Sequence, residues 1–282
     1  MLFKLFTLYI YLQTSLCGCG PDRRNSGFEK PSFKYKLERV GKMDARVRES
    51  SGLAHATDST LITHPDGENP AILYNISKKG ALLDSMLLPQ LQNADWEDLA
   101  EDDEHLYVGD FGNNANNRRD LRIYKINRQN HTLTGTIGFS FEDQEFFPPA
   151  ENNLHFDLEA FFYHQDSLYL FTKSRGKNKK LKLYTLPATP GNYTAKLREQ
   201  LPVNTMATAA DISPDQKQFA ILGYGKLYLF AVENGSINFS GKHYCIPLAR
   251  TGQAEAILYT SPQELLLTNE AGKLFKIVLR PQ

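Results

Sequence analysis

Short apolar runs separated by polar turns recur along the chain, and no segment beyond the N-terminus has a sustained helical period. Each run has about four to seven residues, is rich in aromatic and aliphatic side chains, and is bounded by Gly, Asn, Asp, Ser or Pro. Such side chains fit a pleated, half-buried surface, so these runs are typical of β-strands. The sequence therefore predicts an all-β fold.

The strands are grouped in a module that recurs five times, at intervals of about 45 to 60 residues. Each module opens on an acidic or small residue, continues with an apolar run, and closes on an apolar-aromatic-x-apolar run. The openings are Ser51-Gly52-Leu53, Glu97-Asp98-Leu99, Glu159-Ala160-Phe161, Ala210-Asp211-Ile212 and Glu255-Ala256-Ile257. The closing runs are Leu73-Tyr74-Asn75-Ile76, Ile123-Tyr124-Lys125-Ile126, Leu183-Tyr184-Thr185-Leu186, Leu227-Tyr228-Leu229-Phe230 and Leu274-Phe275-Lys276-Ile277.

A repeat of this size, with three or four strands and no helix, is typical of the blades of a β-propeller. We expect a single propeller of five blades over residues 33–282; a sixth, degenerate blade around residues 133–154 is the alternative. The fifth module ends at Arg280, directly after its third strand. We therefore expect residues 35–40 to supply the missing strand and close the ring, which removes an exposed sheet edge.

The first residues have the features of an export signal: one charge at Lys4 and a short apolar stretch over residues 5–12 that cannot span a bilayer permanently. The following Leu16-Cys17-Gly18-Cys19 resembles a bacterial lipobox. That resemblance implies a signal peptide over residues 1–18 and acyl chains such as palmitate on Cys19, which anchor the protein to a membrane of the cell envelope. An ordinary signal peptide is the alternative.

Residues 19–32 are rich in Gly, Pro, Asn, Ser and charge, and we interpret them as a flexible tether. If Cys17 leaves with the signal and Cys19 is acylated, Cys245 remains alone. We then expect no intramolecular disulfide, and a buried Cys245 without a chemical role.

The charge balance excludes one class of partner. Lys and Arg total 32 residues and Asp and Glu also total 32. Because no basic excess is present, we expect no nucleic-acid partner. We also expect a monomer.

In a propeller, the start of each first strand and the end of each second strand meet at the same face. Polar residues occupy these places in most modules, which predicts a polar axial face. The residues at the strand starts are Glu97, Asp98, Glu159, Asp211 and Glu255, and those at the strand ends are His64, Asp66, Asp110, Lys173, Arg175, Asn269 and Glu270. The alternative for each is a hydrated turn or capping residue.

Carboxylates crowded on one axis repel each other, and a bound cation relieves that repulsion. We therefore expect a hard-cation site, with Ca²⁺ as the candidate cofactor, formed by Glu97, Asp110, Asn113 and Glu159. An Asx-rich turn is the alternative for the segment around Asp110. Trp96 is expected to pack between blades or, alternatively, to form a stacking platform in the ligand-binding face.

A further set of motifs is similar to a family of bacterial secreted β-propeller proteins of uncharacterised function. The motifs are Glu49-Ser50-Ser51-Gly52-Leu53-Ala54, Asp95-Trp96-Glu97-Asp98-Leu99-Ala100, Gly109-Asp110-Phe111-Gly112-Asn113-Asn114, Asp157-Leu158-Glu159-Ala160 and Gln253-Ala254-Glu255-Ala256-Ile257. The resemblance implies fold and compartment rather than a reaction. In broad architecture it extends to calcium-dependent lactonases and to esterase-like and phytase-like propellers, although His64-Pro65-Asp66 departs from the pattern expected there.

We expect an extracytoplasmic, lipid-anchored propeller whose polar face binds a ligand or a partner. The alternative is a metal-dependent hydrolase, a lactonase or an esterase, with Glu97, Glu159 and Glu255 as candidate catalytic carboxylates. No Gly-x-Ser-x-Gly motif is present, which disfavours a serine hydrolase of that kind. Whether the protein is an enzyme is left open by the sequence.

Overall fold

The structure, a computed structural model, describes residues 18–47 and 49–280. Within these residues it is nearly all β-strand, with one short α-helix, α2 (Gly20–Ser26), and one 3-10 turn, η1 (Glu151–Asn153). Three sheets have four strands and one has eight. The predicted all-β class is therefore confirmed.

The four-stranded sheets are antiparallel meanders, in which consecutive strands lie side by side, with β1 as an added edge strand in one of them. One is formed by β2 (Ser50–His55), β3 (Thr60–Pro65), β4 (Ile72–Ser77) and β5 (Leu82–Leu87), and another by β14 (Ala207–Ile212), β15 (Gln218–Gly223), β16 (Lys226–Ala231) and β17 (His243–Pro247). The third contains β18 (Ala254–Ser261), β19 (Glu264–Asn269), β20 (Lys273–Arg280) and β1 (Lys34–Lys42).

The eight-stranded sheet joins two such meanders by their outer strands. Its members are β6 (Trp96–Glu101), β7 (His105–Asp110), β8 (Arg122–Asn127), β9 (Leu133–Phe141), β10 (Asp157–His164), β11 (Ser167–Lys173), β12 (Lys180–Pro187) and β13 (Gly191–Pro202). The joint is a parallel pairing of β9 with β13, from Gly191 beside Ile137 to Ala195 beside Phe141. Residues 133–141 thus form the outer strand β9 rather than the start of a separate sheet.

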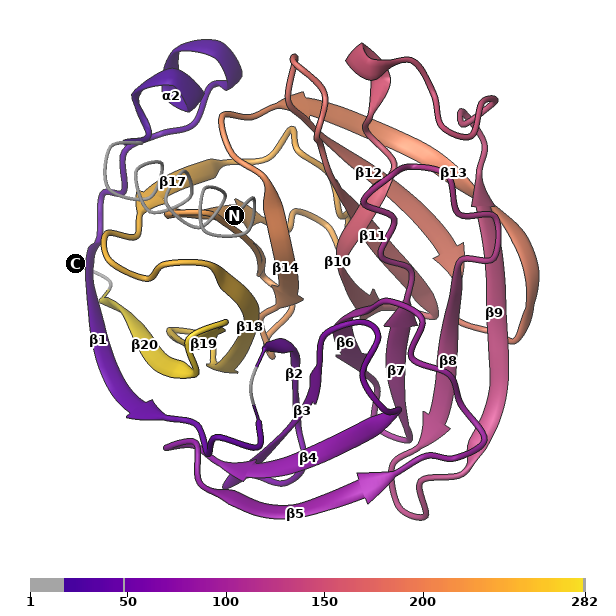
Figure 1. The fold of residues 1–282 in the computed structure, drawn as a ribbon. Helices are drawn as coiled ribbons and strands as arrows, with labels where there is room; N and C mark the ends of the chain where they lie inside the picture. Colours follow the sequence, from indigo (N-terminus) through magenta and orange to yellow (C-terminus); the bar gives the residue numbers. More distant parts are fainter. Residues whose placement is uncertain (1–17, 48, 281–282) are drawn as a thin grey trace, which may run out of the picture.

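The sheets are arranged around a central axis (Figure 1). Their first strands contact one another in a closed order: β2, β6, β10, β14, β18 and again β2. Burial follows this arrangement, because β6 is buried at every residue but its last whereas β5 is half-buried or exposed throughout. Apolar side chains fill the space between neighbouring sheets, as where the rings of Phe162 and Phe219 lie 5.6 Å apart. The architecture is that of a β-propeller.

The predicted closing strand is present. β1 pairs antiparallel with β20, from Lys34 beside Arg280 to Lys42 beside Lys273, and completes the sheet that also holds β18 and β19. The first and last described strands of the chain therefore lie side by side (Figure 1).

The segment expected to be a tether is instead folded onto the sheets. Gly20–Ser26 form helix α2, which the sequence analysis did not predict, and Phe28 is buried. Cys19 forms a disulfide with Cys245, with the two Cα atoms 5.7 Å apart. The expectation of an unpaired Cys245 and an acylated Cys19 is corrected, because a sulfur in a disulfide cannot also carry a lipid thioether.

The proposed signal peptide lies almost entirely outside the described residues. Among the residues that are described, no helix has the length and apolar character needed to cross a membrane.

Candidate functional site at one end of the propeller axis

Each first strand carries a β-bulge at the same place. The register between first and second strands skips one residue in every case, and the skipped residues are Ser51, Glu97, Glu159, Thr208 and Glu255. A bulge re-aims the side chain of its extra residue, so it brings these side chains toward one end of the axis. The three glutamates predicted from the repeat thus occupy equivalent positions in the fold.

The structure also corrects the alignment of the fourth module. Thr208, not Ala210, is the equivalent of Glu97, and its hydroxyl donates to the carbonyl oxygen of Ala254 at 2.7 Å. Asp211 lies three residues further along β14, toward the other end of the axis. It is therefore not part of the predicted polar face.

A buried cation lies among the glutamates. Lys173 Nζ is 2.9 Å from Glu159 Oε1, and both residues are buried. The same Nζ donates to the Tyr224 hydroxyl at 3.4 Å, and that hydroxyl donates to Glu255 Oε1 at 2.8 Å. Arg175 also contacts Glu159, at 3.4 Å, and pairs with Asp157. Tyr224 was missed by the sequence analysis because it lies in the turn after a second strand and is not acidic.

Three carboxylates gather beside this network. Asp66, Asp95 and Glu97 each place one carboxylate oxygen within 4.8 Å of the others. Two glycines pack against them: a Cβ on Gly67 would lie 2.3 Å from Asp95 Oδ1, and one on Gly112 would lie 2.2 Å from Glu97 Oε1. Close approach of the backbone to these carboxylates therefore requires glycine at both positions. We call Asp66, Asp95, Glu97, Glu159 and Glu255 together the acidic mouth.

Ionisation of the carboxyl groups in the acidic mouth is unfavourable, because they are buried and lie close to one another. Burial raises the pKa of Glu97 well above its usual value, and the nearby Glu159, Asp66 and Asp95 raise it further. Burial raises the pKa of Asp95 to about 6 and that of Glu270 to about 8, and the negative charges of neighbouring carboxylates add to this effect. Protons, or a bound cation, must therefore offset the repulsion between these groups.

Two of the predicted metal ligands, Asp110 and Asn113, form hydrogen bonds with loop residues instead. The Asp110 carboxylate accepts hydrogen bonds from Asp95 N at 3.0 Å and from the Arg118 guanidinium at 3.1 Å. Asn113 accepts from Arg118 N at 2.9 Å and donates to Phe156 O at 3.1 Å. Their polar atoms hold the segment after β7, and neither residue belongs to the close carboxylate group. Of the four predicted ligands, only Glu97 does.

Asp98 ties the first strands together rather than facing a ligand. Its fully buried carboxylate accepts from Leu99 N at 2.9 Å, Phe161 N at 3.1 Å and Ala210 N at 3.3 Å. These contacts span β6, β10 and β14, so a single side chain links three of the first strands.

Trp96 and His64 are buried in the wall of the propeller. The Trp96 indole donates to Gln92 O at 2.8 Å and its ring lies 5.6 Å from the imidazole of His64. Neither residue has exposed surface, so the packing interpretation of Trp96 holds and a stacking platform does not. Burial lowers the pKa of His64 to about 4, which leaves its imidazole neutral.

The remaining predicted residues flank the mouth. Asn269 is buried and donates to Thr251 O at 2.6 Å. Glu270 accepts a hydrogen bond from the Gln253 amide at 2.7 Å, and its carboxyl interacts electrostatically with Glu255 and Asp66.

The other end of the axis holds a polar cavity of about 670 Å³. We call its central residues His55, Glu101 and Asp211 the opposite mouth. His55 Nδ1 lies 2.7 Å from Glu101 Oε1, while the Arg128 guanidinium lies 3.3 Å from Glu101 Oε2. Asp211 accepts backbone hydrogen bonds from Ile212 N and Tyr259 N. The sequence analysis did not consider this end.

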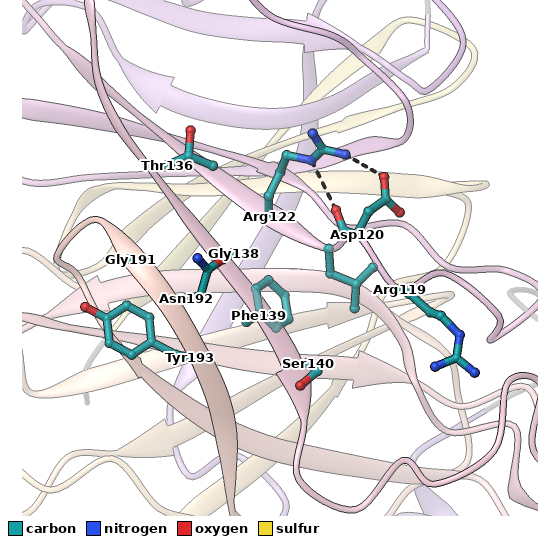
Figure 2. A pocket seen from close by; sticks show the side chains of 11 residues that line it. Arg119, Asp120, Arg122, Thr136, Gly138, Phe139, Ser140, Gly191, Asn192 and Tyr193 are labelled. Carbon is teal, nitrogen blue, oxygen red and sulfur yellow. Dashed lines mark hydrogen bonds and ion pairs between the residues drawn. The ribbon is translucent and has the colours of Figure 1, made fainter.

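Another cavity, of about 510 Å³, lies where β8, β9 and β13 meet (Figure 2). Its Arg122 is paired with Asp120 at 2.5 Å, and Arg119 stacks its guanidinium over the ring of Phe147 at 3.9 Å. It lies at the outer strands, away from the bulges that define the acidic mouth.

Fold and site together define a β-propeller with an acidic mouth at one end of its axis. No family model matches the chain, and no curated protein matches it, so the family suggested by the motifs stays a prediction.

Solved structures do resemble it. An aldose sugar dehydrogenase from Streptomyces coelicolor in its PQQ-bound form has a TM-score of 0.54 at 11% identity, covering 89% of this chain and 100% of that one. A protein of unknown function from Bacteroides thetaiotaomicron has a TM-score of 0.50 at 9% identity, covering 88% and 77%. A gluconolactonase from Xanthomonas campestris has 0.44 at 13% identity, covering 90% and 96%, a score too low to support an argument. At such identities the likeness is one of fold alone.

Proposed function

We propose that this protein is an exported propeller of five blades that binds a divalent cation, Ca²⁺, at its acidic mouth and uses it to hold an oxygen-bearing ligand. The observation that carries the proposal is the close group of Asp66, Asp95 and Glu97. Carboxylate oxygens are the ligands that Ca²⁺ prefers in proteins. The blade count treats the eight-stranded sheet as two blades that share their outer strands β9 and β13.

The charge of the mouth supports a cation as its first ligand. The five carboxyl groups of the acidic mouth, with Glu270 beside them, face two cations, Lys173 and Arg175. Lys173 and Arg175 are already paired with Glu159 and Asp157. Among the residues that the structure describes, the carboxylates around Asp95 therefore have no cationic side chain of their own at ion-pair distance. A divalent ion there offsets the repulsion that raises their pKa values.

The disulfide supports export. Disulfides persist in oxidising compartments and are rare in the reducing cytosol, so a bond between Cys19 and Cys245 fits an extracytoplasmic protein. Because Cys19 forms this bond, we propose no lipid anchor at that residue.

Calcium binding is measured by isothermal titration calorimetry on the protein freed of metal with a chelator. We expect binding that Glu97→Gln or Asp95→Asn weakens at least about tenfold, because each removes one charged ligand. Glu101→Gln, at the opposite mouth, is the matched control and leaves the affinity unchanged. Absence of binding at millimolar Ca²⁺, or equal effects of all three variants, would remove the cation from the proposal.

A hydrolase is the second candidate, and the pairing of Glu159 with Lys173 favours it. A buried carboxyl of raised pKa beside a cation site is suited to take a proton from an attacking water. The reaction class would be hydrolysis of a lactone or an ester. The protein is assayed on lactone and aryl-ester panels with Ca²⁺ present. Turnover that Glu159→Gln abolishes while the fold is intact would establish this function, and no turnover on either panel would discard it.

A further inference from the structure

Residues 19–29, which we call the N-terminal strap, are held against β16 and β17 by covalent and apolar contacts. Cys19 is bonded to Cys245 of β17 across 226 positions of sequence. Phe28 is buried, with its ring centroid 4.6 Å from that of Tyr228. Glu29 exchanges backbone hydrogen bonds with β17, donating to His243 O and accepting from Cys245 N.

The strap also contributes a buried carboxylate, that of Asp22, to the contacts with the propeller. The Asp22 carboxylate accepts from Lys226 Nζ at 2.5 Å and from Asn204 N at 2.7 Å, and Asp22 and Lys226 are both buried. Lys226 in turn donates to Asn204 O at 3.1 Å. One carboxylate thus fixes two separate segments, the loop before β14 and the start of β16. If the strap left, Lys226 would lose its buried counter-ion.

Those two segments are the ones that position Tyr224. Tyr224 lies in the turn between β15 and β16, two residues before Lys226. Its backbone N donates to Met206 O at 3.3 Å, and its carbonyl accepts from the Thr205 hydroxyl at 3.1 Å. Its own hydroxyl then reaches the acidic mouth, where it contacts Glu255 and Lys173. The contacts are therefore continuous from the disulfide to the mouth.

We propose that the disulfide between Cys19 and Cys245 controls the acidic mouth, by holding the strap that positions Tyr224. A dithiol reductant breaks the S–S bond with two electrons and two protons; the two cysteines become thiols and the reductant becomes a cyclic disulfide. Release of the strap frees Asn204 and Lys226, and the Tyr224 turn loosens. The effect on cation affinity rests on the proposed function, whereas the loosening of the turn does not.

Hydrogen exchange of the full chain, with and without dithiothreitol, tests the link. In the reduced protein we expect exchange about tenfold faster in residues 19–29 and also in residues 203–206 and 223–226, with the β3–β4 turn unchanged. Cys245, which is fully buried, should then react with a maleimide in native buffer. Cys19→Ser/Cys245→Ser should show the fast exchange without reductant and no response to it.

Unchanged exchange at residues 223–226 while the strap is released would overturn the proposal, whether or not a cation binds. So would a strap that stays protected after reduction. If calorimetry detects Ca²⁺ binding, reduction should weaken it several-fold. Tyr224→Phe should weaken it similarly while leaving strap exchange slow, which separates loss of the Tyr224 contact from general loosening. Reduction without any change in measurable Ca²⁺ affinity would refute control of the mouth.

Discussion

The two ends of the propeller axis have similar residues but different pairing. At the opposite mouth, Glu101 contacts both His55 and Arg128, so its charge is matched. At the acidic mouth, Asp66, Asp95 and Glu97 lie close together, and no cationic side chain lies within ion-pair distance of any of them among the residues that the structure describes. Both ends are rich in acidic residues, so residue type alone does not separate them.

Backbone geometry explains the difference. Three of the five residues of the acidic mouth, Glu97, Glu159 and Glu255, lie at equivalent bulges, which turn them toward the axis. Glu101 instead lies at the far end of β6, in the part of that strand that pairs without a register shift, and His55 and Arg128 contact it there. Crowded carboxylates at a repeated backbone irregularity therefore indicate a ligand more strongly than acidic composition does.

The largest contrast is expected from removing one cation at each end. Lys173→Met removes the nearer of the two cations that contact the buried Glu159 and leaves only Arg175, at 3.4 Å. We expect a loss of about 3 kcal/mol in the free energy of unfolding at pH 8. Arg128→Met removes a more accessible partner and should cost about 1 kcal/mol. Urea denaturation gives both values. Adding Glu159→Gln to Lys173→Met should recover part of the loss, and equal losses at the two ends would contradict the comparison.

A methyl group at Gly112 should disturb the acidic mouth without unfolding the protein. The Cβ of Gly112→Ala would meet the carboxylate oxygens of Glu97 and Asp95, which must then move. We expect Ca²⁺ affinity to fall about tenfold while stability changes by about 1 kcal/mol. Calorimetry and urea denaturation measure the two effects. Unaltered Ca²⁺ binding would show that these carboxylates need not lie where the structure places them.

Two carboxyl groups, one at each end of the axis, should change the stability with opposite dependence on pH. Burial, then Glu255 and Asp66, raises the pKa of Glu270 from 4.5 to about 8, so the folded state holds a proton there that the unfolded state has lost. Stability from this group therefore falls as pH rises from about 5 to 8. Asp102 lines the cavity at the other end of the axis. Burial also acts to raise the pKa of Asp102, but hydrogen bonds from Tyr107 and from backbone amides lower it overall. Its contribution is present at neutral pH and is lost as pH falls through the range of the carboxyl groups.

Denaturation at several pH values checks this pair. Glu270→Gln should flatten the decline between pH 5 and 8, and Asp102→Asn should flatten the decline on the acid side. A Glu270→Gln protein with the same alkaline slope as the wild type would show that Glu270 is already ionised at pH 5.

The smallest effect concerns two tyrosine hydroxyls. Tyr259, which lines the cavity of the opposite mouth, has a buried hydroxyl without a hydrogen-bond partner among the described residues, so Tyr259→Phe should be neutral or slightly stabilising. Tyr224→Phe removes hydrogen bonds to Glu255 and Lys173 and should cost about 1 kcal/mol. Thermal melting compares the two. A larger loss for Tyr259→Phe than for Tyr224→Phe would reverse the expected order.

Repetition explains why the architecture was predictable. The apolar runs mark the second and third strands of every sheet, and a module one strand short at Arg280 predicts the pairing of β1 with β20. The three glutamates of the acidic mouth were also predictable, because the same residue type recurs at the start of three modules.

The remaining features depend on geometry that the repeat does not encode. Thr208 was missed because it is not acidic. Asp211, three residues later, is acidic, and the repeat was therefore aligned on the wrong residues. Asp95 precedes its strand and meets Asp66 only once two loops are folded. The bond between Cys19 and Cys245 depends on the path of a segment whose composition resembles a linker.

The pairing of β1 with β20 has a consequence for how the protein is made. The ribosome synthesises β1 among the first residues of the domain and β20 among the last, yet Lys34 and Arg280 are neighbours in the finished sheet. A nascent chain therefore cannot complete its ring until β20 has been synthesised, and contacts of such sequence separation form slowly. Any product cut short before β20 keeps an open strand edge, which marks it for proteolysis or aggregation rather than for a partly active form.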